Sequence, residues 1–445
     1  MGIEQILPLS MFPVLLMVIL SGYPVAFTLS GTALVFALLG HYFDLFYLED
    51  LGFIPLRVYG IVQKFTLVAV PLFVFMGLTL EKSGVARELL TAINRIFQRQ
   101  RGSLAIGVVV VGAMLAASTG IVGATVVTMG VLSLPTMLEY GYDKKLATGS
   151  IAAAGTLGQI IPPSIVLVLL GDMMNVDVGD LFVGSMIPGL LLVGAYILYI
   201  RGRIFFSPDL APKATIDADS KGWALLEPQL WRALGPPLFL VSLVLGSILG
   251  GLASPTEAAA CGALGALIVA FSKRKLNKVM LQQVMEDTAK VTAMVFFILV
   301  GAQFFGVVFR GLAGDELITE LLMELGLHRD LVLFLLMVLL FGLGFFLDFL
   351  EICFIVIPIV LPIMTSLGYE PLWLGVLIAV NLQTSFLTPP FGFALFYLKG
   401  VAPPEIKTGD IYKGVMPFVL IQIGILVTLV MFPQLVTYLP YQVFK

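Results

Sequence analysis

Apolar residues are arranged along this chain in long runs, which short charged or glycine- and proline-rich segments separate. A membrane-spanning helix needs about 20 consecutive, mostly apolar residues. Runs of roughly this length predict ten spans. The predicted spans cover residues 5–21, 24–40, 61–80, 146–170, 181–200, 233–250, 256–271, 291–309, 373–398 and 414–436.

Two further apolar blocks, 102–138 and 331–367, are too long for one helix that crosses a membrane. Each is interrupted near its middle, at Ser-Thr-Gly in 118–120 and around Gly344 to Asp348. Each block is therefore expected to form either two short spans or one re-entrant helical hairpin. Both alternatives leave the sidedness of the other spans unchanged.

The composition supports a polytopic membrane protein. Of the 445 residues, 59% are hydrophobic and 12% are charged, whereas a soluble domain has about 45–50% apolar and about 25% charged residues. This composition excludes an ordinary soluble protein and a disordered chain. The basic residues are scattered and the net charge is −3, so no nucleic-acid partner is expected. Cys261 and Cys353 lie in apolar runs and His41 and His328 in polar loops, which predicts neither a disulfide framework nor a metal site.

The basic residues divide unevenly between the two sides of the membrane. Of the 25 Lys and Arg residues, 20 fall in one set of connecting segments, and the positive-inside rule places this set in the cytoplasm. Both termini are then expected in the periplasm. The cytoplasmic set comprises 81–101, 139–146, 201–232, 273–290 and 399–413.

The two halves of the sequence share proline and glycine motifs at a constant spacing of 227 positions. The matched pairs are Pro135 with Pro362, Gly141 with Gly368, and Pro162 with Pro389. Each half contains five spans and one interrupted block, and because five is odd the second half is expected to be inverted in the membrane. Inverted repeats with discontinuous helices are typical of secondary transporters. The alternative is a duplication without transport by alternating access, as in some channels.

The interruptions at 155–163 and 381–390 fall in the middle of predicted spans. Backbone groups in a membrane must be satisfied internally, so a broken helix there needs a reason. Unwound carbonyls and short polar side chains suit Na⁺, and the N-termini of half-helices suit an anion. The alternative interpretation is a pair of proline kinks that serve packing alone.

Polar groups also occur at the tips of the two interrupted blocks. Asp348 and Glu351 lie three residues apart, and the sequence has no Lys or Arg between Arg329 and Lys399 that could pair with them. A carboxylate within a membrane costs about 2.5 kcal/mol or more and is a functional hypothesis by default. The Ser-Thr-Gly patch at 118–120 is a second candidate, although small residues also serve close helix packing.

These motifs resemble those of a known family, and the likeness covers nearly the whole chain. The chain is similar to the large membrane subunit of tripartite ATP-independent periplasmic (TRAP) transporters. The matching features are Ser-Thr-Gly at 118–120, Gly-Thr-Leu-Gly-x-x-Ile-Pro-Pro-Ser at 155–164, Phe-Leu-Asp at 346–348 and Leu-Thr-Pro-Pro-Phe-Gly at 387–392.

The resemblance implies an elevator-type, sodium-coupled importer of small organic anions, of carboxylate or keto-acid type, in the bacterial inner membrane. It implies two partners, a small four-helix membrane subunit and a soluble periplasmic substrate-binding protein. Na⁺ would be the coupling ion, with no other cofactor. The fold class would be an all-α polytopic membrane protein with two inverted repeats, each with five transmembrane helices, one of them broken, and one re-entrant hairpin.

The resemblance also implies site residues by position. The first sodium site would use Ser118, Thr119, Gly120, Gly155, Thr156, Gly158 and Pro162, and the second Gly344, Asp348, Gln383, Thr384, Thr388 and Pro389. Residues near the substrate would be Ser118, Thr119, Gln159, Asp348, Glu351 and Asn381. Glu351 departs from the family pattern, because a carboxylate beside an anion site repels substrate unless it is protonated, paired or turned away.

The expected organisation follows from the repeats. A scaffold would comprise 1–90 and 233–310, a transport unit 91–205 and 311–445, and a cytoplasmic linker 206–232. The nearest alternative function is a stand-alone divalent-anion/sodium symporter, and a channel is more distant. A membrane-embedded enzyme is disfavoured, because the sequence has no His-Glu-x-x-His, no Walker-type loop and no second intramembrane Asp near Asp348.

Overall fold

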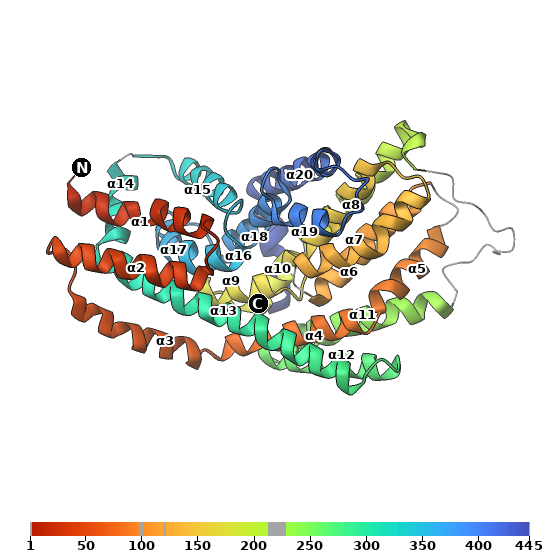
Figure 1. Cartoon of the computed structure of the whole chain (residues 1–445), viewed down its shortest axis with the longest axis horizontal. Coiled ribbons are helices and arrows are strands. Elements are labelled where there is room, and N and C mark those ends of the chain that lie inside the picture. Colours follow the sequence, from red (N-terminus) through yellow and green to blue (C-terminus); the bar gives the residue numbers. More distant parts are fainter. Residues whose placement is uncertain (1, 98–100, 120–121, 212–227, 325, 445) are drawn as a thin grey trace.

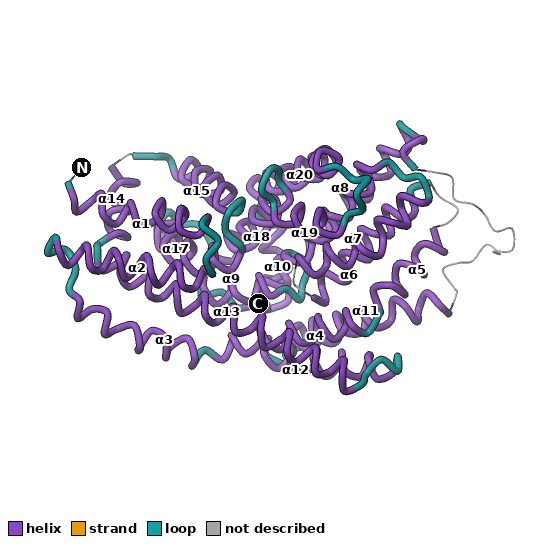
Figure 2. The backbone as a smooth tube through the Cα atoms, viewed as in Figure 1, coloured by secondary structure: helices purple, strands orange, loops and turns teal. Residues whose placement is uncertain are grey.

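The computed structural model describes residues 2–97, 101–119, 122–211, 228–324 and 326–444, and it is helical without strands over these residues (Figure 2). Ten of the described helices are long and apolar enough to cross a membrane. The predicted all-helical polytopic membrane fold is therefore confirmed.

Eight of these ten helices coincide with predicted spans. They are α1 (Ile3–Leu20), α2 (Val25–Tyr42), α4 (Ala69–Lys82, extended by the 3-10 turn η2, Phe65–Val68), α10 (Val178–Phe206), α11 (Pro228–Leu249), α12 (Pro255–Ser272), α13 (Lys278–Gly311) and α20 (Thr408–Met431). The other two are the second arms of the long apolar blocks, Val122–Glu139 and Phe349–Ser366.

Both long blocks form two helical arms. In the first, α6 (Ser103–Thr119) precedes α7 (Val122–Glu139), and Gly120 of the predicted interruption lies outside the described residues. In the second, α15 (Arg329–Leu343) is followed by a helix that begins at Phe349. That second arm consists of α16 (Phe349–Glu351), the π-helical turn η6 (Ile352–Val356) and α17 (Ile357–Ser366). We refer to α6–α7 as hairpin 1 and to α15–α17 as hairpin 2.

Two predicted spans are interrupted near their middle, as their glycines and prolines indicate. In the first, α8 (Lys144–Thr156) and the 3-10 turn η3 (Leu157–Gln159) precede α9 (Ile165–Met174). In the second, α18 (Pro371–Leu387) precedes α19 (Phe393–Val401). The Pro-Pro peptide bonds at 162–163 and 389–390, which lie in these breaks, are both cis.

The apolar pattern missed four shorter helices, α3 (Ile54–Gln63), α5 (Val85–Phe97), α14 (Gly314–Glu324) and α21 (Gln434–Phe444). α5 is amphipathic, with Leu89 buried and Arg87 and Glu88 exposed, so its charges interrupt the apolar run.

Some predicted boundaries and environments also differ from the structure. The predicted span at 61–80 begins inside α3, because the backbone is extended at Lys64 between α3 and η2. The last predicted span ends at Met431, two residues before Pro433. His41 lies in the last turn of α2 and not in a loop. Cys261 is exposed on the surface of α12, whereas Cys353 is buried.

The order of the elements in the first half recurs in the second. Each half begins with three apolar helices, which are α1, α2 and α4 in the first half and α11, α12 and α13 in the second. A short helix (α5 or α14), a hairpin, a broken span and a long helix (α10 or α20) follow in the same order. The halves also pack crosswise, because α2 contacts α13, α4 contacts α12, α8 contacts α20, and α18 contacts α10. Figure 1 shows α3, α13, α4 and α12 along one long edge, with the two broken spans towards the centre.

The crossing of α8 and α20 is the closest of these contacts between the halves. A Cβ atom at Gly149 would lie 2.1 Å from the carbonyl oxygen of Gly414, and one at Gly414 would lie 2.3 Å from that of Lys145. No side chain fits into such a gap without moving a backbone, so glycine at both positions permits this crossing.

Replacing Gly149 by alanine is expected to destabilise the protein by about 1–3 kcal/mol, because the added methyl group clashes with backbone. Gly424→Ala, in the exposed part of α20, is the matched control because its Cβ would meet no atom within 4 Å. There alanine should leave the stability unchanged or raise it slightly. Thermal unfolding of the detergent-solubilised protein measures both. Equal effects of the two substitutions would contradict the role of Gly149.

Candidate functional site

Hairpin 1 packs tightly against the first broken span. A Cβ atom at Gly112 would lie 2.6 Å from the Cβ of Ala154, and one at Gly155 would lie 2.2 Å from Cγ2 of Val126. Both arms of the hairpin therefore lie directly against the end of α8. Gly112 permits the contact of α6, and Gly155 permits the contact of α7. This packing brings the predicted site residue Gly155 against hairpin 1.

Hairpin 2 is held on the second broken span by two hydrogen bonds. Asn381 Nδ2 donates to the carbonyl of Met337 at 2.8 Å, and Ser385 Oγ donates to the carbonyl of Phe341 at 2.7 Å. The two donors lie one helical turn apart on α18, as do the two acceptors on α15. A Cβ atom at Gly344 would lie 2.6 Å from Ser385 Oγ, so the end of α15 lies directly beside α18.

Each half-helix that follows a break packs on the hairpin of the other half. A Cβ atom at Gly123, near the tip of hairpin 1, would lie 2.9 Å from Cζ of Tyr397 on α19. In the same way α9 contacts α16, η6 and α17 of hairpin 2. The two breaks and the two hairpins therefore meet in one region, and α9, α16, α18 and α19 lie near its centre in Figure 1.

Three predicted site threonines have their hydroxyl protons engaged within their own helices. Thr156 donates to the carbonyl of Ala153 at 2.9 Å. Thr384 donates to Val380 at 2.7 Å, and Thr388 donates to Thr384 at 2.7 Å. A hydroxyl oxygen has two lone pairs, so each of the three can still accept a bond or coordinate a cation, although Thr156 Oγ1 already accepts one long bond from Gln422 Nε2 at 3.4 Å.

Two buried glutamines beside the breaks make no well-aligned hydrogen bond among the described residues. Gln159 and Gln383 are both 0% exposed; neither atom of the Gln159 amide has a partner within this part of the chain, and the Gln383 amide lies near the Tyr196 hydroxyl without a bond of good geometry. Buried polar groups are nearly always satisfied in proteins, so each such exception needs an explanation such as an ion, a water molecule or a ligand.

Behind the first break lies a buried polar group that the sequence did not indicate. Gln422 Nε2 of α20 donates to Tyr196 Oη of α10 at 2.6 Å and is 3.4 Å from Thr156 Oγ1. Tyr196 and Gln422 are both fully buried. The sequence signal for Gln422 was a polar amide side chain within the apolar run 414–436, where polar residues are rare. Ser385 was also missed, although it lies four residues after Asn381 on the same helical face.

The two carboxylates of hairpin 2 cap the start of its second arm. Asp348 Oδ1 accepts a hydrogen bond from the Phe349 amide at 2.7 Å, and Glu351 Oε2 accepts one from the Asp348 amide at 3.0 Å. Glu351 is 5% exposed and is turned back onto the backbone. The two carboxylates therefore satisfy amide groups that the break in the helix leaves free.

The remaining predicted site residues lie at or near the breaks. Gly158 belongs to η3, Pro162 to the first break and Pro389 to the second. Ser118 and Thr119 end α6, but their side chains lie outside the described part of the chain, as does Gly120. Within the described residues, no group of three or more His, Cys, Asp or Glu side chains could hold a metal ion.

A cavity of about 720 Å³ separates α3, α13 and α14 from α9 and hairpin 2. At its edge, Lys64 Nζ donates to Asp172 Oδ2 at 2.8 Å, and Thr66 Oγ1 donates to Asp172 Oδ1 at 2.9 Å. The Asp172 side chain is 7% exposed. These bonds connect the segment between α3 and α4 with the end of the first broken span.

Comparisons with known proteins agree with this architecture. The family model described as "Tripartite ATP-independent periplasmic transporter, DctM component" matches residues 12–435. The C4-dicarboxylate TRAP transporter large permease protein of Vibrio cholerae is 32% identical over 403 residues, which cover 84% of this chain and 86% of that protein. The sialic acid TRAP transporter large permease protein of the same organism is 27% identical over an alignment that covers 94% of this chain and 95% of that protein.

A solved structure shows the same fold at low sequence identity. The YdaH transporter of Alcanivorax borkumensis aligns with a TM-score of 0.63 at 18% sequence identity. The alignment covers 87% of this chain and 89% of the YdaH chain. The relatives are transport permeases, which agrees with the expectation that the chain is not an enzyme. This multi-pass protein of the inner membrane belongs to the DctM family, the large permease component of tripartite ATP-independent periplasmic transporters.

Proposed function

We propose that the protein imports a small organic anion of the carboxylate type, driven by a sodium gradient. The observation that carries this proposal is the pairing of two helix breaks, each beside a hairpin and each with a buried glutamine amide that lacks a well-aligned partner among the described residues. Secondary transporters bind substrate and coupling ions at such discontinuous helices.

Sodium fits the oxygen atoms that the two breaks offer. Hard cations prefer carbonyl, hydroxyl and amide oxygens. At the first break these come from Thr156, the Gln159 amide and the backbone near Gly158. At the second they come from Thr384, Thr388 and the Gln383 amide. The tips of the two hairpins, at 118–120 and 344–348, would complete one site each.

An organic anion fits between the two sodium sites. Helices α9 and α19 both begin just after a break, so the positive ends of their dipoles face this region. Most of the relatives are named for compounds that carry a carboxylate, namely C4-dicarboxylates, ectoine, 2,3-diketo-L-gulonate and sialic acid, and one is named for isethionate, which is a sulfonate. A carboxylate substrate is therefore the best supported class.

Movement of one unit against the other would provide alternating access. The predicted scaffold segments 1–90 and 233–310 pack on each other through α2, α4, α12 and α13. The predicted transport unit holds both hairpins and both breaks, and the bonds from Lys64 and Thr66 to Asp172 cross between the two units. An elevator movement, with both termini in the periplasm, would have to break these bonds in every cycle.

The partners of such a system are a small four-helix membrane subunit and a periplasmic binding protein that delivers the substrate. The family description names a tripartite system, and one relative, an isethionate transporter permease, is named DctMQ. Dependence on a binding protein separates this proposal from a stand-alone anion/sodium symporter.

Uptake into proteoliposomes tests the function directly. Vesicles with the large and small subunits, supplied with the loaded binding protein and an inward sodium gradient, should accumulate the carboxylate ligand of that protein. Omission of the binding protein or replacement of Na⁺ by K⁺ should reduce uptake to the background of empty vesicles. Full uptake without the binding protein would favour the stand-alone symporter, and full uptake without sodium would refute the coupling.

Cross-linking tests the relative movement of the two units. In a variant without native cysteines, Lys64→Cys with Asp172→Cys, joined by a short bifunctional thiol reagent, should abolish uptake because the link spans the moving boundary.

The matched control uses an ion pair of similar geometry within the scaffold. Lys82 Nζ lies 2.6 Å from Asp287 Oδ2, and both residues belong to scaffold helices. Linking Lys82→Cys to Asp287→Cys should leave uptake intact. Undiminished uptake after complete linking of positions 64 and 172 would contradict an elevator movement at this boundary.

A further inference from the structure

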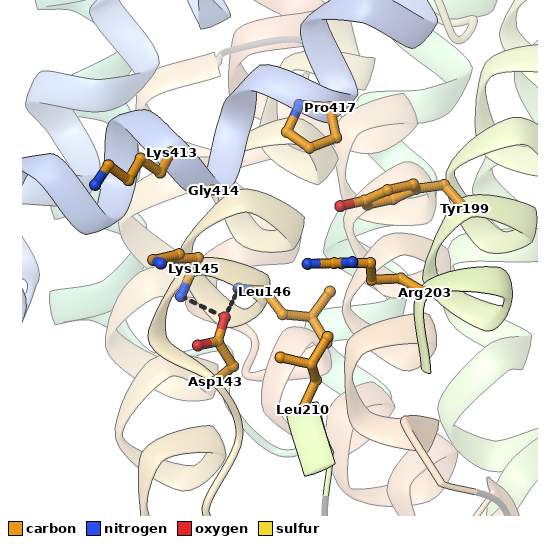
Figure 3. Close-up of a pocket in the computed structure, with 9 residues that line it drawn as sticks. All are labelled: Asp143, Lys145, Leu146, Tyr199, Arg203, Leu210, Lys413, Gly414 and Pro417. Carbon is orange, nitrogen blue, oxygen red and sulfur yellow. Dashed lines mark hydrogen bonds between the residues drawn. The ribbon is translucent and has the colours of Figure 1, made fainter. Parts of the chain in front are cut away.

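A second cavity, of about 300 Å³, lies between α8, α10 and α20, away from the breaks (Figure 3). It is lined by Asp143, Lys145, Leu146, Tyr199, Arg203, Leu210, Lys413, Gly414 and Pro417. In Figure 3 the Tyr199 hydroxyl and the Arg203 guanidinium point from α10 into the space between the helices, with Lys145 on the opposite side, whereas Lys413 extends outward at the rim.

Among the described residues, no carboxylate forms an ion pair with the cationic side chains of this cavity. These side chains are those of Lys145, Arg203 and Lys413. The one carboxylate, that of Asp143, caps the start of α8, where its Oδ1 accepts bonds from the Lys145 and Leu146 amides at 3.1 and 3.0 Å. A concave surface of one sign concentrates ions of the opposite sign, so the cavity attracts an anion.

The cavity forms where three basic segments of the chain converge. The segments 139–146, 201–232 and 399–413 all belong to the side that the positive-inside rule places in the cytoplasm. Phe205 and Phe206, just beyond Arg203 on α10, are 80% and 82% exposed, and Leu198 just before Tyr199 is 73% exposed. Such apolar side chains beside cationic ones place the cavity at the level of the lipid headgroups.

We propose that this cavity binds a phosphoryl group at the cytoplasmic surface of the membrane. The planar guanidinium of Arg203 matches two phosphate oxygens, Lys145 adds a point charge, and the Tyr199 hydroxyl donates a hydrogen bond. The phosphoryl group comes either from an anionic phospholipid of the inner leaflet or from free phosphate in the cytoplasm, and the experiment distinguishes these sources.

Occupancy of this site would join elements of both halves of the chain. Helices α8 and α10 belong to the first half and α20 to the second, and all three pack around the first break. The Asp143 amide also donates to the carbonyl of Leu210 at 3.0 Å, which fixes the segment after α10 at the same cavity. A bound phosphoryl group should therefore stabilise the folded protein.

Thermal unfolding of the purified protein in a neutral detergent measures this stabilisation, independently of transport. The added compounds are dihexanoyl phosphatidylglycerol, dihexanoyl phosphatidylcholine, inorganic phosphate, and potassium chloride at matched ionic strength. Phosphatidylglycerol should raise the unfolding temperature in a saturable manner, whereas phosphatidylcholine and potassium chloride should not. A similar rise with inorganic phosphate alone would identify the source as free phosphate.

Substitutions then locate the effect. Lys145→Gln with Arg203→Gln should weaken the binding of phosphatidylglycerol about thirtyfold, since each basic side chain near an anionic group contributes measurably to affinity. Arg203→Lys keeps the charge but loses the two-pronged geometry, so it should weaken binding less than Arg203→Gln does. Lys275→Gln with Lys278→Gln, two exposed residues of the basic segment 273–290, is the control of equal charge and should leave binding unchanged.

Three results would overturn the proposal. They are an absence of stabilisation by both phosphatidylglycerol and phosphate, an equal stabilisation by potassium chloride at the same ionic strength, and an unaltered affinity in the Lys145→Gln, Arg203→Gln variant.

Discussion

Inside a membrane, a helix that stops leaves amide and carbonyl groups that no water can satisfy. The described residues show three such interruptions, one in hairpin 2 and two in the broken spans, and the neighbouring helices pack around them. Asp348 and Glu351 satisfy amides at the break in hairpin 2. At the two broken spans, the amides of Gln159 and Gln383 lack well-aligned partners among the described residues, and the proposed function assigns a ligand to each of these places.

The two breaks share one environment because the halves of the chain pack crosswise. Each hairpin lies against the first part of its own broken span and against the second part of the other. In the first half this approach depends on small residues such as Gly112 and Ala154. In the second half it depends on hydrogen bonds from Asn381 and Ser385 to carbonyls of α15. The two halves therefore reach a similar arrangement by different local chemistry.

The sequence predicted eight of the ten long apolar helices and the interruptions at 155–163, 344–348 and 381–390, because these features depend on local composition. It missed α5, whose charged face interrupts the apolar pattern, and α3, α14 and α21, which are too short to span a membrane. It also missed contacts that only the fold creates. Lys64 and Asp172 are 108 positions apart, and Gln422 and Tyr196 are 226 positions apart, so no local pattern could pair them. The repeat at 227 positions indicated that the halves are related, but not which helices cross.

The central claim is that each broken span holds one sodium ion beside its hairpin. Equilibrium binding of ²²Na⁺ to the purified protein measures this directly. We expect saturation at two ions per chain, loss of one ion in Thr156→Val or Thr388→Val, and no change in Thr428→Val. The Thr428 hydroxyl is bonded in the same way, to the carbonyl of Gly424 at 2.8 Å, but it is exposed on α20. Binding of two ions that survives the double substitution Thr156→Val, Thr388→Val would contradict the account.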